Sequence, residues 1–410
     1  MSISTVANTL SDLYATAQDV SQGTWISRVW IPGAAPGPAV VLLKDRQVHD
    51  ISARVATVSA LLELDDPVAY LRSLPLQQPL IGLDDLLRNS DAANRDETRP
   101  WLLAPIDLQA VKAAGVTFAT SMLERVVEEQ AKGDPAKADS IRATLVQSIG
   151  ADLGDIVPGS VQAAALKEVL ISQGMWSQYL EVGIGPDAEI FTKAQPLSAV
   201  GFGSDIGIHP KSSWNNPEPE VVLAVSSRGK IQGATLGNDV NLRDFEGRSA
   251  LLLSKAKDNN ASTSLGPFIR LFDETFGIDD VRSAEVALRV EGQDGFILDG
   301  SSSMNQISRD PTDLVAQTLN ENHQYPDGFV LFLGTLFAPK QDRDLPGGGF
   351  THKVGDTVAI SSPKLGTLVN RVTTSDRAPA WQIGYRALLD NLHGRGLVDA
   401  AIKPRLPSGA

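Results

Sequence analysis

The second half of the chain contains many short segments of strand composition, separated by turns rich in glycine, asparagine and aspartate. These segments include VVLAVSS at 221–227, KIQGATLG at 230–237, VALRVEG at 286–292, FVLFLGT at 329–335 and DTVAISS at 356–362. Strands this short and this frequently turned favour a closed or rolled antiparallel sheet over a Rossmann-type fold. The rolled sheet is therefore the first prediction for this part of the chain.

Helical patterns interrupt this region at only two places. They are SRDPTDLVAQTLNE at 308–321 and APAWQIGYRALLDNL at 378–392. Before the strands, residues 108–174 have a helical pattern in which good helix formers predominate and Gly and Pro are confined to the joints.

The N-terminal part has the pattern of a small α/β unit. TWISRVWIP at 24–32 and AVVLLKD at 39–45 have strand composition, and VATVSALLEL at 55–64 has helical spacing. The polar, proline-bearing stretch 95–105 marks a boundary. We therefore expect an N-terminal α/β domain over residues 1–100 and a second domain over residues 101–410.

Composition narrows the possible functions. The chain has 410 residues, a formal net charge of −13 and no cysteine. The charge argues against nucleic acid or an anionic membrane surface as the main partner, and the missing cysteines exclude disulfides and thiolate sites. The sequence has neither a secretory signal pattern nor an apolar run long enough to span a bilayer. We expect a cytoplasmic enzyme or binding protein.

Two acids stand directly before a buried strand in the stretch NPEPEVVLAV, Asn216 to Val225. Residues i and i+2 of a strand point to the same face, so Glu218 and Glu220 would converge there. If the next strand forms a hairpin with this one, Asp239 in GNDVNLRD returns beside them. Three carboxylates without cysteine suit Mg²⁺, Mn²⁺ or Ca²⁺ rather than zinc. The alternative is that the acids simply rim a strand and a turn.

Two further residues have open interpretations. Lys257 lies between an apolar segment and a polar loop, where it is either a buried base or anion-binding group, or an exposed lysine on a turn. His352 follows the glycine run PGGGF, and a lone histidine is more often structural than catalytic.

Five separated motifs together resemble the fumarylacetoacetate hydrolase family. They are EPE, GNDVNLRD, KAKDNNASTSLGP, FLGT and KVGDTVAISSPKLGTLVNRV, and they span about residues 185–375 in the family's order. The resemblance implies an α+β fold, the mixed β-roll of this family. It also implies a small N-terminal α/β domain and a helical lid segment at about 106–180.

The same resemblance implies roles for individual residues. Glu218, Glu220 and Asp239 would hold one Mg²⁺, or Mn²⁺, which a 2-keto acid substrate chelates. Lys257 would project into the site. Gly334, Thr335, Arg243 and Phe118 would contact the substrate. Family members commonly form dimers or tetramers, so we expect a homo-oligomer.

The lid segment departs from the pattern of the family's hydrolases. In GVTFATSMLERVVEEQ, Phe118 takes the aromatic place, Ser121 the place of a water-activating histidine, and Glu124 that of its glutamate partner. Without that histidine, the segment resembles the subgroup of sugar-acid dehydratases that convert 2-keto-3-deoxy-pentonates to 2,5-dioxopentanoate. In such a dehydration, Lys257 would remove a proton from C3 and Glu124 would protonate the departing C4 hydroxyl.

Two alternatives remain at the level of sequence. One is a Mg²⁺-dependent hydrolase of 2,4-diketo acids or acylpyruvates, in which another residue such as His352 activates water. The other is a keto-acid-binding module without catalysis.

Overall fold

The chain is built around one large sheet and one smaller sheet. The computed structural model describes Ala17 and residues 20–404, except for 133–136, 138–140, 142–155, 173, 175, 336, 338, 340 and 345–348. In hydrogen-bonded order, the large sheet contains β4 (Ile81–Gly82), β3 (Gln47–Asp50), β2 (Gly37–Lys44), β1 (Trp25–Ile31), β13 (Thr263–Leu271), β11 (Ile231–Asp239), β10 (Pro219–Val225), β16 (Phe329–Phe332), β6 (Ala110–Gly115) and β7 (Glu189–Ala194), with β5 (Trp101–Leu103) beside β1.

The second sheet has five strands. Their order is β15 (Ile297–Ser303), β14 (Glu285–Glu291), β17 (Thr357–Ser362), β18 (Gly366–Thr374) and β8 (Asp205–Ile208). A separate two-stranded ladder joins β12 (Asn241–Leu242) and β9 (Asn215–Asn216). Most strand pairs are antiparallel, whereas β16 pairs with β6 and β18 with β8 in parallel. The predicted mixed roll of short strands is confirmed.

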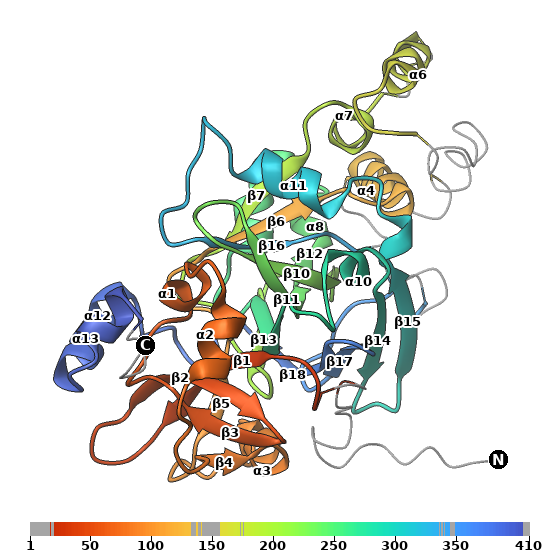
Figure 1. Cartoon of the computed structure of the whole chain (residues 1–410). Helices are drawn as coiled ribbons and strands as arrows, with labels where there is room; N and C mark the ends of the chain where they lie inside the picture. Colours follow the sequence, from red (N-terminus) through yellow and green to blue (C-terminus); the bar gives the residue numbers. More distant parts are fainter. Residues whose placement is uncertain are drawn as a thin grey trace.

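Helices cover the sheets and form one end of the molecule. They are α1 (Val58–Leu62), α2 (Pro67–Ser73), α3 (Leu83–Ser90), α4 (Ala119–Ala131), α6 (Val161–Ser172), α7 (Gln178–Ile184), α8 (Arg243–Glu246), α9 (Leu253–Lys257), α10 (Ile278–Arg282), α11 (Pro311–Thr318), α12 (Tyr385–Gly394) and α13 (Val398–Ile402), with 3₁₀ turns at Ala250–Leu252 and Met304–Gln306. Helices α4, α6 and α7 lie at the end opposite strands β2 to β5 (Figure 1). Within the described residues, none of the helices has the length and apolar character needed to cross a bilayer.

The centre of the large sheet is buried on both faces because the side chains of β10 alternate between two cores. Leu223 packs into a core that also contains Leu288 of β14 and Ile360 of β17. Its neighbour Val222 faces the other way, into a core shared with Leu61 of α1. Strands buried on both faces read as continuous apolar runs, as VVLAV does.

One secondary-structure prediction is wrong. Residues 110–115, AVKAAG, fall within the stretch predicted as helical but form β6. This strand pairs in parallel with β16 on one side and antiparallel with β7 on the other. Alanine-rich sequence favours a helix locally, but pairing on both edges outweighs that preference.

The large sheet is continuous across the predicted domain boundary near residue 100. Trp25 and Ile26 of β1 pair with Arg270 and Ile269 of β13. The N-terminal strands therefore extend the same sheet that contains β10 and β11. The division into residues 1–100 and 101–410 remains a prediction.

Candidate active site

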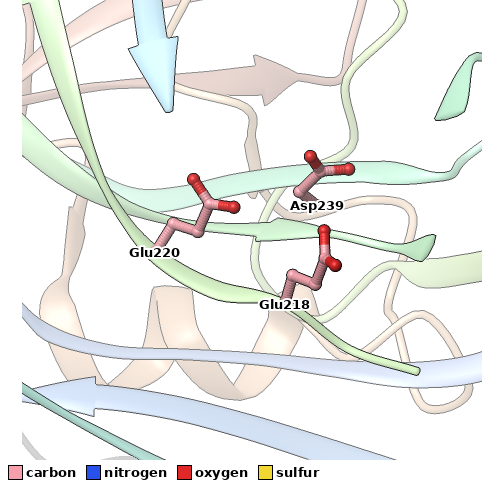
Figure 2. A group of neighbouring side chains, drawn as sticks. All are labelled: Glu218, Glu220 and Asp239. Atoms are coloured by element: carbon pink, nitrogen blue, oxygen red, sulfur yellow. The ribbon is translucent and has the colours of Figure 1, made fainter. Parts of the chain in front are cut away.

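Three carboxylates converge at the edge where β10 and β11 meet. Glu220 lies on β10, Glu218 immediately precedes that strand, and Asp239 is the last residue of β11. The two strands form the predicted hairpin, with Glu220 opposite Gly237, and the Asp239 N–H donates to the Glu218 carbonyl over 3.0 Å. One oxygen from each side chain lies within 4.8 Å of the others, and all three residues are buried. Figure 2 shows the three carboxylates close to one another.

One of the three acids, Glu220, lies mainly among other negative charges. Burial, together with the nearby Asp239 and Glu218, raises the pKa of Glu220 well above its ordinary value. The Gly334 N–H donates to Glu220 Oε2 over 2.6 Å, which offsets only part of this effect. Three oxygen ligands with mutual repulsion fit a hard divalent cation, which would relieve that repulsion.

Lys257, at the end of α9, is buried against two of these acids. Its Nζ lies 2.5 Å from Glu218 Oε2 and 3.1 Å from Asp239 Oδ2. Burial opposes its charged form, but the two carboxylates outweigh burial and raise the pKa of Lys257. Of the two interpretations of this residue, the exposed turn is excluded, since only 2% of Lys257 is exposed.

Arg125, which no motif in the sequence indicated, also reaches this cluster. It lies on α4 and binds Glu218 Oε1 at 2.5 Å and Glu246 Oε2 at 2.9 Å. Although burial opposes it, Lys257 and Arg125 hold the pKa of Glu218 below its ordinary value. The helix predicted as a lid therefore contacts the acid cluster through arginine, a residue type that pairs well with carboxylates.

Glu189, on β7, is a second residue of the site that no motif in the sequence indicated. It stands opposite Gly115 of β6, and a Cβ atom at Gly115 would lie 2.0 Å from Glu189 Oε2. The glycine thus leaves the space that the Glu189 carboxyl occupies. Burial and the nearby Glu246 raise the pKa of Glu189 from 4.5 to about 7, despite the opposing charges of Arg125 and Lys257. A carboxyl with such a pKa can donate or accept a proton near neutral pH.

These groups line one partly open cavity, whose non-atom space is about 360 Å³ with open solvent included. Besides the three converging acids, its lining includes Arg125, Glu189, Glu246, Lys257, Gly334 and Thr335. Below the lining, the buried Lys193 lies 3.2 Å from Asp239. With every group ionised, the five carboxylates exceed the three cations by two charges, which one divalent cation would neutralise.

Some residues assigned by the resemblance lie elsewhere. Glu124 of α4 is buried 3.6 Å from Arg243, whose guanidinium stacks on Trp214, and neither residue lines the cavity. Phe118 packs in the main core. Ser121 lies in α4, but its side chain is outside the described part of the structure. Only Thr335 and Gly334 of the predicted substrate contacts lie at the cavity.

His352 is buried away from these acids. Its Nδ1 lies 3.1 Å from Asp356 Oδ2, and burial lowers its pKa below the ordinary value. Among the described residues, it does not belong to the cavity lining. The geometry therefore offers no support for His352 as the group that activates water.

Comparison with known proteins adds a family and a group of relatives. The model of the fumarylacetoacetate (FAA) hydrolase C-terminal family matches residues 186–373. A probable 2-keto-3-deoxyxylonate dehydratase from Haloferax volcanii is 30% identical over 265 residues, which cover 59% of this chain and 88% of the relative. A 2-dehydro-3-deoxy-D-arabinonate dehydratase from Saccharolobus solfataricus is 33% identical over 184 residues, which cover 45% of this chain and 58% of the relative.

A solved structure has the same fold. It is a 2-keto-3-deoxy-D-arabinonate dehydratase complexed with magnesium and 2,5-dioxopentanoate, with a TM-score of 0.59 and 22% sequence identity. The match covers 85% of this chain and 99% of that chain. Taken with the extent of the sequence match, these findings establish that the chain belongs to the fumarylacetoacetate hydrolase family.

Proposed function

We propose that this protein is a Mg²⁺-dependent hydro-lyase that converts a 2-keto-3-deoxy-pentonate to 2,5-dioxopentanoate and water, with Mn²⁺ as a possible substitute. The observation that carries the proposal is one cavity that combines three converging, buried carboxylates with a lysine and a glutamate whose pKa is about 7. The similarity to the two dehydratases described above supports this substrate class.

Glu218, Glu220 and Asp239 would hold the metal ion, because three hard oxygen donors match the ligands that Mg²⁺ prefers. Bound there, a divalent cation would polarise the 2-keto group of the substrate and make its C3 protons more acidic. Thr335 and Gly334 line the same cavity, and we assign them to the substrate carboxylate.

Lys257 would remove a proton from C3. The amine can act as a base only when neutral, and its ion pairs with Glu218 and Asp239 oppose this by raising its pKa. Lys257 gives up its proton more readily once these carboxylates serve as metal ligands, because their negative charge is then shared.

Glu189 would donate a proton to the C4 hydroxyl as it leaves, in place of the predicted Glu124. Its pKa of about 7 keeps much of it protonated at neutral pH, and its carboxyl lines the cavity, whereas Glu124 pairs with Arg243 outside it. Loss of the C3 proton and the C4 hydroxyl leaves a C3=C4 double bond. A proton then moves from C5 to C3 to form the C5 enol. This enol takes up a proton at C4 and releases its hydroxyl proton, which gives the C5 aldehyde.

The direct test is an assay of the metal-loaded protein with a 2-keto-3-deoxy-pentonate. The expected result is an aldehyde product with all five carbons retained. Release of pyruvate from an acylpyruvate, without dehydration, would instead identify a C–C hydrolase. A protein that binds keto acids with Mg²⁺ but turns over neither substrate class would be a binding module.

A further inference from the structure

Lys193 is a fully buried lysine whose amine touches both the acid cluster and the segment that carries Lys257. It lies on β7 with 0% of its side chain exposed. Its Nζ lies 3.2 Å from Asp239 Oδ1, on the opposite carboxylate oxygen from the one that binds Lys257. The same amine donates to the carbonyl of Lys257 over 2.5 Å and to that of Ser262 over 3.0 Å.

These contacts close the loop between α9 and β13. The Ser262 hydroxyl also donates to the Lys257 carbonyl, over 2.7 Å, so this carbonyl receives two donors. Lys193 therefore holds the two ends of residues 257–262 together and fixes the backbone from which the Lys257 side chain starts. A buried charge is costly unless it is paired and hydrogen-bonded, and Lys193 has both kinds of partner.

Strand β7 carries Lys193 together with two residues that line the cavity. Glu189 and Phe191 occupy alternating positions and therefore share one face of the strand. Lys193 follows at a bulge, because the register of the β6–β7 pair shifts between Thr192 and Ala194. Phe191 lies under the amine of Lys257, with the ring centroid 5.6 Å from Nζ. One strand thus contacts Lys257 both at its backbone and at its amine.

We propose that Lys193 is a positioning residue that sets the direction of the Lys257 amine relative to Asp239. It does not touch the substrate. The inference rests on the proposed function for the task of Lys257, which is removal of the C3 proton. An error of about 1 Å in the placement of a catalytic group can slow a reaction about 100-fold.

The experiment measures proton removal separately from dehydration. Wild type, Lys193→Met and Lys112→Met are incubated in D₂O with saturating Mn²⁺ and 2-oxobutanoate, and exchange of the C3 protons is followed by NMR. Lys112 is the matched control, since it is a buried lysine on the adjacent β6 that bonds Thr192 and lies outside the cavity lining. Binding of Mn²⁺ is measured by EPR and folding by circular dichroism.

We expect Lys193→Met to bind Mn²⁺ at saturation and to exchange C3 protons about 100-fold more slowly than wild type. Its kcat for the dehydration should fall in parallel, while KM changes little. Lys112→Met should match wild type. Wild-type exchange rates in Lys193→Met at saturating Mn²⁺ would overturn the positioning role.

A second variant keeps the test decisive if Lys193→Met does not fold. Ser262→Ala removes the other donor to the Lys257 carbonyl, and we expect slower exchange, by about 3- to 10-fold, with the fold retained. Unchanged exchange in this variant would then overturn the proposal. Absence of exchange in the wild-type protein is a different outcome, because it would refute the base role of Lys257 in the proposed function.

Discussion

At the scale of single residues, the pKa of each buried carboxylate depends on how many positive groups lie beside it. Glu218 faces two cations, Lys257 and Arg125, and has a lowered pKa, whereas Glu220 faces mainly other acids and has a raised one. Two glutamates only two residues apart therefore differ in the direction of their pKa shifts, because different groups surround each of them. A divalent cation among them would favour the ionised form of all three acids.

Substitution of Glu218 tests the metal site. We expect Glu218→Gln to lower the affinity for Mg²⁺ by more than about 100-fold while the protein stays folded, since a ligand is lost and the volume is kept. Isothermal titration calorimetry with Mg²⁺ measures the affinity. Glu291→Gln, in β14 of the second sheet, is the control and should bind normally. Full Mg²⁺ binding by Glu218→Gln would locate the metal elsewhere.

Glu189 gives a prediction for the pH dependence of activity. It donates a proton only while protonated, so kcat/KM should fall as the pH rises through about 7. In Glu189→Gln, this alkaline limb should disappear and kcat should be at least about 100-fold lower at pH 6. Rate profiles between pH 5 and 9 check this. An unchanged alkaline limb in the variant would assign the titration to another group.

The same residue should affect stability in the metal-free protein. Its pKa is raised in the folded state, so its contribution to stability is present below pH 4.5 and is lost as the pH rises through about 7. Glu189→Gln avoids this loss and should be more stable than wild type at pH 8, by roughly 3 kcal/mol at most, but not at pH 5. Urea unfolding at both pH values in EDTA measures the difference. Equal stability at pH 8 would show that Glu189 is not desolvated.

At the scale of secondary-structure elements, the pair β6–β7 shapes the cavity as much as the hairpin β10–β11 does. β7 carries Glu189, Phe191 and Lys193, and β6 supplies the glycine that leaves room for Glu189. Helix α4 adds Arg125 from a third direction. In the proposed site, the hairpin would provide the metal ligands, and these flanking elements would provide the proton donor and the positive charges.

Gly115 on β6 can be tested by adding one methyl group. Gly115→Ala would bring a Cβ to 2.0 Å from Glu189 Oε2, so the carboxyl must move. We expect the fold to be retained and kcat to fall about 10- to 100-fold, because a displaced acid no longer meets the leaving group. Gly82→Ala on β4 is the control, as its nearest contact is 4.0 Å away. Steady-state kinetics compare the two, and equal kcat values would contradict the role given to Glu189.

At the scale of the whole molecule, the N-terminal strands and the acid cluster belong to one continuous sheet. β1 pairs with β13, β13 with β11, and β11 ends at Asp239. Ile269 of β13 packs in a core together with Leu61 of α1 and Leu71 of α2. Removing the first hundred residues would expose this core and leave β13 with an open edge.

We therefore expect the fragment 101–410 not to fold on its own, despite the domain boundary that the sequence suggests near residue 100. Circular dichroism and urea unfolding of this fragment test the point, with the full chain as the reference. A cooperative unfolding transition and Mg²⁺ binding by the fragment would instead support two independent domains.

The sequence by itself determined the hairpin and its three acids. Strand periodicity places Glu218 and Glu220 on one face, and the turn length brings Asp239 beside them, so these contacts follow from local geometry. The short β-rich segments likewise predicted the sheet-rich roll, since their turns and composition are local properties. The family motifs lie in this same part of the chain.

Only the tertiary structure decided which other groups complete the cavity. Glu189, Lys193 and Arg125 are far from the hairpin in sequence, and each reaches it through packing between distant elements. The strand β6 was predicted as helix because its alanines favour a helix locally, whereas pairing with β16 and β7 fixes it as a strand. The helical neighbours Glu124 and Arg125 point to different surroundings, and no pattern in the sequence specified which of the two lines the cavity. Local periodicity gives the face of an element, but the partner of that face is set by long-range packing.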